Sequence, residues 1–197
     1  MTPPPARFED ALISLGWNDA VSNLYEPFDK PARHPGRVVR VDRGSSVVAT
    51  RKGTTRAPMA RDAAPPTSPA TGDWVVLRPD PDHGEVIEAI LPRRSTITRL
   101  DPSSPDSRPD EQVLAANIDR VFNVHGLDRV PQPVRIERSM VVDWESGAQP
   151  TLVLTKSDLL EADEIEEITF DLEQLAHGVD VIPISNTTGA GIGDILA

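Results

Sequence analysis

Short runs of β-branched and apolar residues alternate with turn residues in the first half of the chain. Such runs, each lying close to a glycine, predict β-strands separated by tight turns. Several short strands of this kind are typical of a small barrel or sandwich. A short helix is expected before them, at Phe8–Leu15. The predicted strands are Arg37–Asp42, Ser46–Thr50, Asp73–Leu77 and Glu85–Leu91.

The second half of the chain has a different pattern, in which strand-like runs alternate with helical spacing. Val134–Trp144 and Ile165–Leu175 place apolar residues three or four positions apart, as amphipathic helices do. Alternating strands and helices predict βαβ units and a parallel sheet. Trp144, like Trp74, is expected in the core rather than at a ligand. The strand-like runs are Ile118–Val124, Thr151–Leu154 and Val179–Ile184.

Two proline-rich segments interrupt these patterns. Asp101–Asp110 holds three prolines, three serines and no apolar residue, so nothing in it can be buried and we expect a linker. Ala57–Ala70 is expected to be a long loop of the first module. The predicted organisation is a helical extension over 1–34, a β-module over 35–100, a linker over 101–112 and an α/β module over 113–197.

Charge is spread unevenly along the 197 residues, which carry 20 Lys/Arg, 31 Asp/Glu and a formal net charge of −11. Residues 31–100 hold 12 basic and seven acidic side chains, whereas residues 101–197 hold six and 19. This asymmetry indicates two modules with different partners. In the basic run Arg33–Arg61, phosphate contact with structured RNA is expected rather than base stacking, because the run contains no aromatic residue. A solvated strand face is the alternative. The candidate RNA-binding residues are Arg33, Arg37, Arg40, Arg51, Lys52 and Arg56.

Composition excludes several classes of site. The chain has no cysteine, which rules out disulfides, thiolate zinc sites and a cysteine nucleophile. Its four histidines are scattered, so no metal site is expected. The segment Met1–Asp10 lacks the apolar run of a signal peptide, and no run approaches the about 18 apolar residues of a membrane span. We expect a cytoplasmic monomer without a membrane segment.

The first candidate binding motif is Thr155-Lys156-Ser157-Asp158, directly after the predicted strand Thr151–Leu154. Ligands of open parallel sheets bind at the carboxyl ends of the strands. An aspartate there can accept hydrogen bonds from both N1–H and N2–H₂ of guanine, a donor pair that adenine lacks. The lysine stem can lie along the base. The alternative is a surface turn that caps the next helix.

The second candidate motif is the glycine-containing segment Pro183–Gly191, at the end of the predicted strand Val179–Ile184, and its candidate binding residues are Ser185, Asn186 and Thr187. Its small polar residues form a turn that can present backbone N–H groups to guanine O6. The alternative is an ordinary loop between a strand and a helix. The two motifs lie about 27 positions apart, one helix and one strand, so they are expected at neighbouring strand ends. Together they favour guanine recognition.

TKSD followed by ISNTTGAGI resembles the paired base-recognition motifs NKxD and SA(K/L) of GTPases. More specifically, the chain resembles the circularly permuted GTPases of the RsgA family, also called YjeQ or EngC. The resemblance covers about residues 35–197. Thr155 stands where the family more often has Asn, and Asn186 where it more often has Ala. The segments that carry the resemblance, in family order, are GDWVVL, LPRRSTITR, EQVLAANIDRVFNV, RIERSM and PTLVLTKSDL.

This resemblance implies a β plus α/β fold: an N-terminal OB-fold barrel followed by part of a circularly permuted P-loop GTPase domain. It implies a GTP hydrolase that assists late maturation of the small ribosomal subunit, with the barrel on rRNA and hydrolysis driving release. GTP with Mg²⁺ is the implied cofactor, and zinc is expected only in a C-terminal domain. The chain contains no GxxxxGK[ST] phosphate loop. We therefore expect an N-terminal fragment, inactive alone, with no catalytic residue of its own. The alternative is a non-catalytic RNA-binding protein with a degenerate α/β half.

Overall fold

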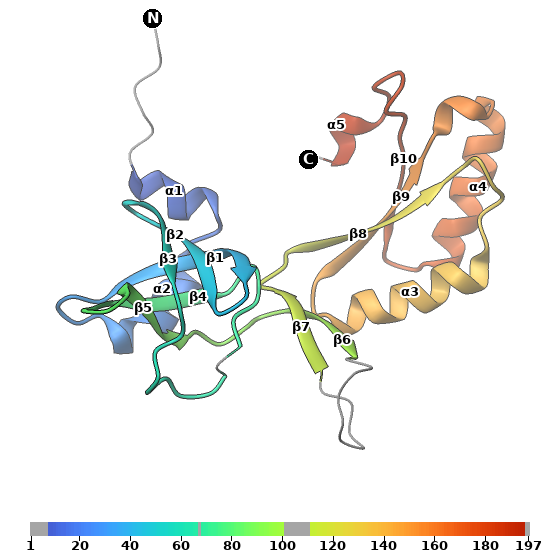
Figure 1. Ribbon diagram of the computed structural model, residues 1–197. Helices are drawn as coiled ribbons and strands as arrows, with labels where there is room; N and C mark the ends of the chain where they lie inside the picture. Colours follow the sequence, from blue (N-terminus) through green and yellow to red (C-terminus); the bar gives the residue numbers. More distant parts are fainter. Residues whose placement is uncertain (1–7, 67, 101–110, 196–197) are drawn as a thin grey trace, which may run out of the picture. The chain divides into compact units, whose positions relative to one another are not determined.

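The computed structural model describes residues 8–66, 68–100 and 111–195. The chain divides into two compact units, Met1–Asn117 (unit 1) and Ile118–Ala197 (unit 2) (Figure 1). Unit 2 thus begins at Ile118, whereas the sequence analysis expects the α/β module to begin at 113. Residues 101–110 of the expected linker lie outside the described residues.

Unit 1 is built on a five-stranded antiparallel sheet with the order β3-β2-β1-β4-β5. The four predicted strands are confirmed with shifted ends. An isolated parallel bridge between Met59 and Ile87 joins the segment after β3 to β5. No sheet of the described residues closes into a barrel, so the predicted OB barrel is not confirmed. The strands are β1 His34–Asp42, β2 Ser45–Thr50, β3 Gly53–Ala57, β4 Trp74–Asp80 and β5 Gly84–Ile90.

Strand β4 supplies two separate cores, because successive side chains of a strand point to opposite faces. Val75 and Leu77 pack with β1, β2 and β5, whereas Trp74 and Val76 pack against the N-terminal helices. All four are at most 3% exposed, and burying such a side chain stabilises the fold by about 1.5–3 kcal/mol. The helices on this second face are α1 Phe8–Ser14, the unpredicted α2 Asp19–Tyr25 and the 3₁₀ turn η1 Glu26–Phe28.

A two-stranded antiparallel sheet, which the sequence analysis did not predict, completes unit 1. It pairs β6 Thr96–Leu100 with β7 Glu111–Ala116, so residues 111 and 112 of the expected linker are in a strand. The Ala116 N–H donates to the Thr71 carbonyl at 2.8 Å. Gly72, with φ of +94°, permits this approach, because a Cβ there would collide with the Ala116 carbonyl.

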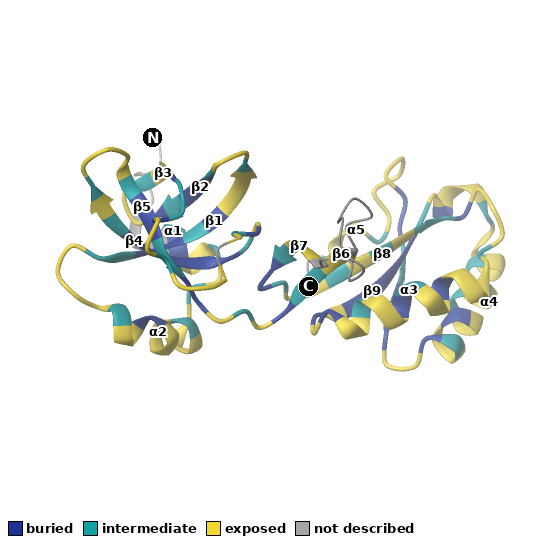
Figure 2. Cartoon of the chain, turned by 60° about the horizontal axis from the view of Figure 1, so that its bottom comes forward, coloured by how far each residue is buried: buried dark blue, intermediate teal, exposed yellow. Residues whose placement is uncertain are grey.

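Unit 2 contains a three-stranded parallel sheet with the order β10-β9-β8, which confirms the predicted βαβ units. Figure 2 shows buried positions on the sides of α3 and α4 that face the sheet and exposed positions on their outer sides. Leu152 and Leu154 of β9 form the centre of this core and are fully buried. The elements are β8 Arg120–Gly126, α3 Pro133–Glu145, β9 Gln149–Thr155, η2 Ser157–Leu159, α4 Ala162–Leu175, β10 Asp180–Pro183 and α5 Ile192–Ile195.

The two tryptophans that were expected in the core differ. Trp74 is 3% exposed, as expected. Trp144 is 51% exposed, so that expectation is wrong. It lies in the last turn of α3, beyond the buried Ile136 and Met140, and lines a shallow groove of about 280 Å³. No helix in the described parts of the chain is long and apolar enough to cross a membrane.

Candidate functional site

The two predicted binding motifs lie side by side at the carboxyl end of the parallel sheet. In the register of β9 with β10, Leu154 pairs with Pro183. The Ile184 N–H donates to the Leu154 carbonyl at 2.7 Å, and the Ser157 N–H donates to the Ile184 carbonyl at 3.1 Å. Both strands therefore end at the same level, and their following segments are tied together by backbone hydrogen bonds.

Ser185 and Asp158 make the principal side-chain contact between the motifs. The Ser185 hydroxyl donates to Asp158 Oδ1 at 2.5 Å and accepts from the N–H groups of Thr187 and Thr188, both at 3.1 Å. Ser185 is 1% exposed, whereas Asp158 is exposed. Among the described residues, Asp158 Oδ2 has no hydrogen-bond partner. The buried serine thus orients the carboxylate of an exposed residue and leaves its second oxygen free for solvent or a ligand.

The loop after β10 is folded tightly around this serine. The Gly189 N–H donates to the Ser185 carbonyl at 2.9 Å, and the Ser185 N–H donates to the Ala190 carbonyl at 3.0 Å. Gly191, with φ of +68°, can be only glycine without strain, because a Cβ would collide with the Pro183 carbonyl. The exposed Asn186 N–H makes no hydrogen bond within the described residues, so it is available as a donor beside Asp158.

Lys156 is held in place by its backbone and by a carboxylate that the sequence analysis missed. Its φ of +63° is uncommon for a residue with a Cβ, and such residues cluster at functional sites. Its Nζ lies 2.9 Å from Oδ2 of Asp128, and this contact lowers the pKa of the Asp128 carboxyl. Asp128 follows β8, the neighbouring parallel strand. Because Asp128 comes shortly after the predicted strand Ile118–Val124, the sequence could have placed it at the same edge of the sheet as the two motifs.

A series of polar contacts joins Thr155, at the end of β9, to residues of β8 and α3. The Thr155 hydroxyl donates to the His125 carbonyl at 3.3 Å. His125 Nε2 lies 2.8 Å from Asn123 Oδ1, and Asn123 Nδ2 donates to Asp143 Oδ2 at 2.8 Å. Because the Asn123 amide nitrogen faces a carboxylate, its oxygen faces the histidine and Nε2 carries the proton. Burial, followed by the charge of Arg135, lowers the pKa of His125.

Three of the candidate RNA-binding arginines are engaged within unit 1. Arg33 makes a bidentate ion pair with Glu88. Arg37 donates to the backbone carbonyls of Leu15, Gly72 and Asn117, and its guanidinium lies over the Trp74 ring at 5.2 Å. Arg40 pairs with Asp42 through two hydrogen bonds of 2.8 Å but remains 63% exposed.

The other three candidates are more open. Arg56 also reaches Asp42, at 2.8 Å, and is 59% exposed. Arg51 and Lys52 lie at the turn between β2 and β3, and their side chains have no partner among the described residues. The Thr50 hydroxyl fixes this turn by accepting from the Lys52 N–H at 3.1 Å and donating to the Gly53 carbonyl at 2.8 Å.

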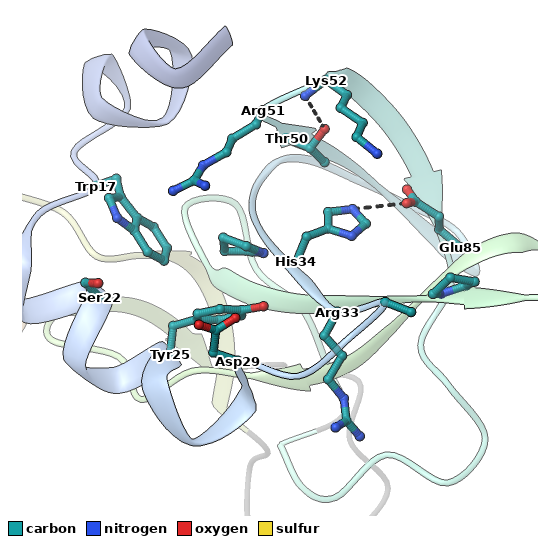
Figure 3. Close-up of a pocket in the computed structure, with 13 residues that line it drawn as sticks. Trp17, Ser22, Tyr25, Asp29, Arg33, His34, Thr50, Arg51, Lys52 and Glu85 are labelled. Atoms are coloured by element: carbon teal, nitrogen blue, oxygen red, sulfur yellow. Dashed lines mark hydrogen bonds and ion pairs between the residues drawn. The ribbon is translucent and has the colours of Figure 1, made fainter.

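Arg51 and Lys52 border a pocket of about 490 Å³ in unit 1 (Figure 3). The same pocket is lined by Trp17, which lies just before α2, by Tyr25, the last residue of α2, and by His34. The sequence analysis found no aromatic residue in the basic run, and these two lie upstream of it. Folding brings them beside the basic turn, a proximity for which the sequence carries no local signal.

The described residues provide no group of three or more His, Asp or Glu that could hold a metal ion. An Mg²⁺ ion bound with GTP would need ligands such as a phosphate-loop hydroxyl, and the chain has no such loop. The described residues therefore offer no set of ligands for this ion.

The sequence model of the family described as RsgA GTPase matches residues 90–197. "Small ribosomal subunit biogenesis GTPase RsgA" of Streptomyces coelicolor is 39% identical over 192 residues, which cover 95% of this chain and 50% of that protein. The protein of the same name from Streptomyces avermitilis is 38% identical over 191 residues, 94% of this chain and 50% of that protein. The chain thus spans about half the length of the curated relatives it matches.

Two crystal structures have a similar fold. YjeQ from Thermotoga maritima matches with a TM-score of 0.62 and 21% identity, over 83% of this chain and 56% of that chain. YloQ, described as a circularly permuted GTPase, matches with a TM-score of 0.62 and 18% identity, over 85% of this chain and 57% of that chain. At these identities the likeness concerns the fold alone.

Proposed function

The chain belongs to the RsgA GTPase family, and we propose that it is the RNA-binding and guanine-reading half of a GTPase that acts on the small ribosomal subunit. The names of its relatives, small ribosomal subunit biogenesis GTPases, support the subunit as partner. The proposed location is the cytoplasm, as a monomer. A non-catalytic protein with a degenerate α/β half is not favoured, because the family match lies mainly over that half.

The hydrogen bond from Ser185 to Asp158 is the observation that carries the guanine assignment. It leaves Asp158 as an oriented acceptor for guanine N1–H and N2–H₂, a pair of donors that adenine does not offer. The Asn186 N–H is the proposed donor to guanine O6. The Lys156 stem is proposed to cover the base while Asp128 holds its ammonium group. Thr155, Ser157 and Thr187 shape this site rather than contact the base.

Hydrolysis requires parts that these 197 residues do not contain. Phosphoryl transfer depends on a Gly-rich loop with its lysine and on Mg²⁺, which neutralise charge on the β- and γ-phosphates. The lysines of the chain are Lys30, Lys52 and Lys156, none in a GK[ST] sequence. We therefore assign base selection to this chain, no catalytic residue and no zinc ligand. GTP with Mg²⁺ remains the proposed substrate complex of the whole protein.

An OB-type module over residues 35–100 is the proposed RNA-binding part. Its strand order and the parallel bridge between Met59 and Ile87 support an incompletely closed OB topology. Two backbone hydrogen bonds of 2.8 Å between Ile87 and residues Pro58 and Ala60 reinforce that bridge. The proposed RNA contacts are the more exposed of the six candidate residues, Arg40, Arg51, Lys52 and Arg56.

Ligand-observed NMR tests the guanine assignment on this chain. Guanosine monophosphate should bind weakly, and adenosine monophosphate should not compete with it. Asp158→Ala should abolish the guanosine signal, whereas Asp163→Ala, a matched loss of an exposed carboxylate in α4, should leave it unchanged. Equal binding of both nucleotides, or an unaffected Asp158→Ala variant, would remove the basis of the assignment.

The salt dependence of binding to a paired RNA hairpin tests the RNA assignment. Each phosphate contact contributes about one unit to the slope of log K against log salt. Arg40→Ala with Arg56→Ala should reduce that slope by about two units relative to the parent chain. A slope that does not change would mean that this face is only solvated.

A further inference from the structure

The pocket of unit 1 combines an aromatic wall with an unpaired basic edge. In Figure 3, Trp17 and Tyr25 stand on one side of the space, and Arg51 extends toward Trp17 from the turn between β2 and β3. Lys52 extends from the same turn toward the side of Glu85. Trp17 packs edge-on against Tyr25 and Trp74, with ring centroids 5.9 and 5.2 Å apart, and keeps part of its ring exposed.

The Tyr25 hydroxyl is an unsatisfied polar group beside this pocket. Tyr25 is 7% exposed, and its oxygen has no hydrogen-bond partner among the residues that the structure describes. Buried polar groups are nearly always paired, and leaving one unpaired costs about 1–3 kcal/mol. Burial and the nearby Asp29 carboxylate raise the pKa of Tyr25, so the hydroxyl keeps its proton as a donor. A ligand that supplies an acceptor here would satisfy it.

The charges around the pocket favour an anion at one edge. Arg33 is neutralised by Glu88, and His34 Nε2 lies 3.0 Å from Oε1 of Glu85. Arg51 and Lys52 are exposed and have no carboxylate partner among the described residues. The two side chains without a carboxylate partner both start at the turn between β2 and β3, and from there Arg51 extends toward Trp17 and Lys52 toward the side of Glu85.

We propose that this pocket binds a single nucleotide, with its phosphate at Arg51 and its base against Trp17 and the Tyr25 hydroxyl, while Lys52 adds positive charge at the same turn. The proposal rests on the proposed RNA binding of unit 1 and deepens it. A planar base with polar edges fits an aromatic wall that carries one free donor, and a phosphate fits the unpaired guanidinium group of Arg51. The nucleotide can be an unpaired residue of an RNA chain or a free mononucleotide, since both offer this chemistry.

The test uses an RNA hairpin with one unpaired adenosine, the same hairpin fully paired, and adenosine monophosphate as competitor. The parent chain should bind the hairpin with the unpaired base about tenfold more tightly, as expected for one stacked base. Arg51→Ala with Lys52→Ala should abolish this preference. Arg43→Ala with Arg61→Ala, which removes two exposed arginines elsewhere in unit 1, should weaken both hairpins equally and keep the preference.

Tyr25→Phe is the sharpest variant, because it removes only the unpartnered oxygen. It should leave the melting temperature unchanged or raised and reduce the preference for the unpaired base by about two- to tenfold. Displacement by adenosine monophosphate would show that a free nucleotide also fits, whereas a preference without displacement would assign the pocket to RNA. Equal binding of both hairpins with no effect of the mononucleotide would overturn the proposal while leaving the RNA assignment intact. Binding of neither hairpin would overturn the RNA assignment itself.

Discussion

The Arg93 guanidinium holds the Asp73 carboxylate through two hydrogen bonds, both 2.7 Å long. Asp73 is 0% exposed, and its Oδ2 also accepts from the Ala70 N–H at 2.7 Å. The two residues belong to GDWVVL and LPRRSTITR, segments through which the chain resembles its family. In this structure they join the start of β4 to the segment after β5, so both segments serve the fold of unit 1.

Arg93→Ala should destabilise unit 1 by about 3–5 kcal/mol, because it leaves a buried carboxylate without its cation. Arg93→Lys should also destabilise, since an ammonium group cannot reproduce the paired geometry. Denaturant unfolding of the chain measures both changes. Arg43→Ala is the control and should shift stability by less than about 0.5 kcal/mol. An Arg93→Ala variant as stable as this control would contradict the assignment.

Arg37 should prove to be a residue of the fold rather than an RNA contact. Its guanidinium serves three backbone carbonyls and lies over Trp74, so Arg37→Ala should lower stability by about 2–3 kcal/mol. Arg51→Ala should leave stability unchanged and weaken RNA binding. Unfolding curves and RNA titrations well below the melting temperature separate the two effects. Normal stability with weakened RNA binding in Arg37→Ala would reverse the assignment.

The strands that the sequence analysis predicted are those with their own apolar runs, such as β2 and β4. Strand β3 reads GTTRA and has no such run. It is a strand because its backbone pairs with β2, in a register that runs from Ser46 opposite Ala57 to Thr50 opposite Gly53. Strand β7 likewise pairs with its neighbour, β6, and its end is fixed by the approach of Ala116 to Gly72. A strand that is formed by pairing with its neighbour needs no periodic apolar signal in its own sequence.

The candidate site also contains both contacts that the sequence could predict and contacts that it could not. Parallel strands end at one edge, so the proximity of Asp158 and Ser185 could be predicted from two motifs that each follow a strand. Asp128 could be placed at that edge, but its contact with Lys156 depends on the left-handed backbone at Lys156. The pocket of Trp17 and Arg51 was not predictable, because α2 was not predicted.

The Lys156–Asp128 ion pair should give a measurable pH dependence. Lys156 lowers the pKa of the Asp128 carboxyl, so the folded state binds this proton less tightly than the unfolded state does. The pair therefore contributes stability above the unfolded aspartate pKa and loses it as pH falls through the lowered folded pKa.

Carboxyl carbon NMR measures this effect directly. In Lys156→Ala the pKa of Asp128 should rise toward the ordinary aspartate value. Lys52→Ala should leave it unchanged, and an unchanged pKa in Lys156→Ala would refute the pairing.

Asp158→Asn should change the base preference from guanine to xanthine. The carboxylate accepts from both guanine donors, whereas the amide nitrogen would face the guanine N2 amino group, donor against donor. Xanthine has a carbonyl at that place and can accept. One unpaired polar contact costs about 1–3 kcal/mol, so the ratio of guanosine to xanthosine monophosphate affinities should fall by at least about fivefold. Ligand-observed NMR with both nucleotides measures this ratio in the parent chain, in Asp158→Asn and in the control Asp163→Asn. If Asp158 only capped a turn, its substitution would lower stability slightly and leave the ratio as it is in the control, an outcome that would end the guanine assignment.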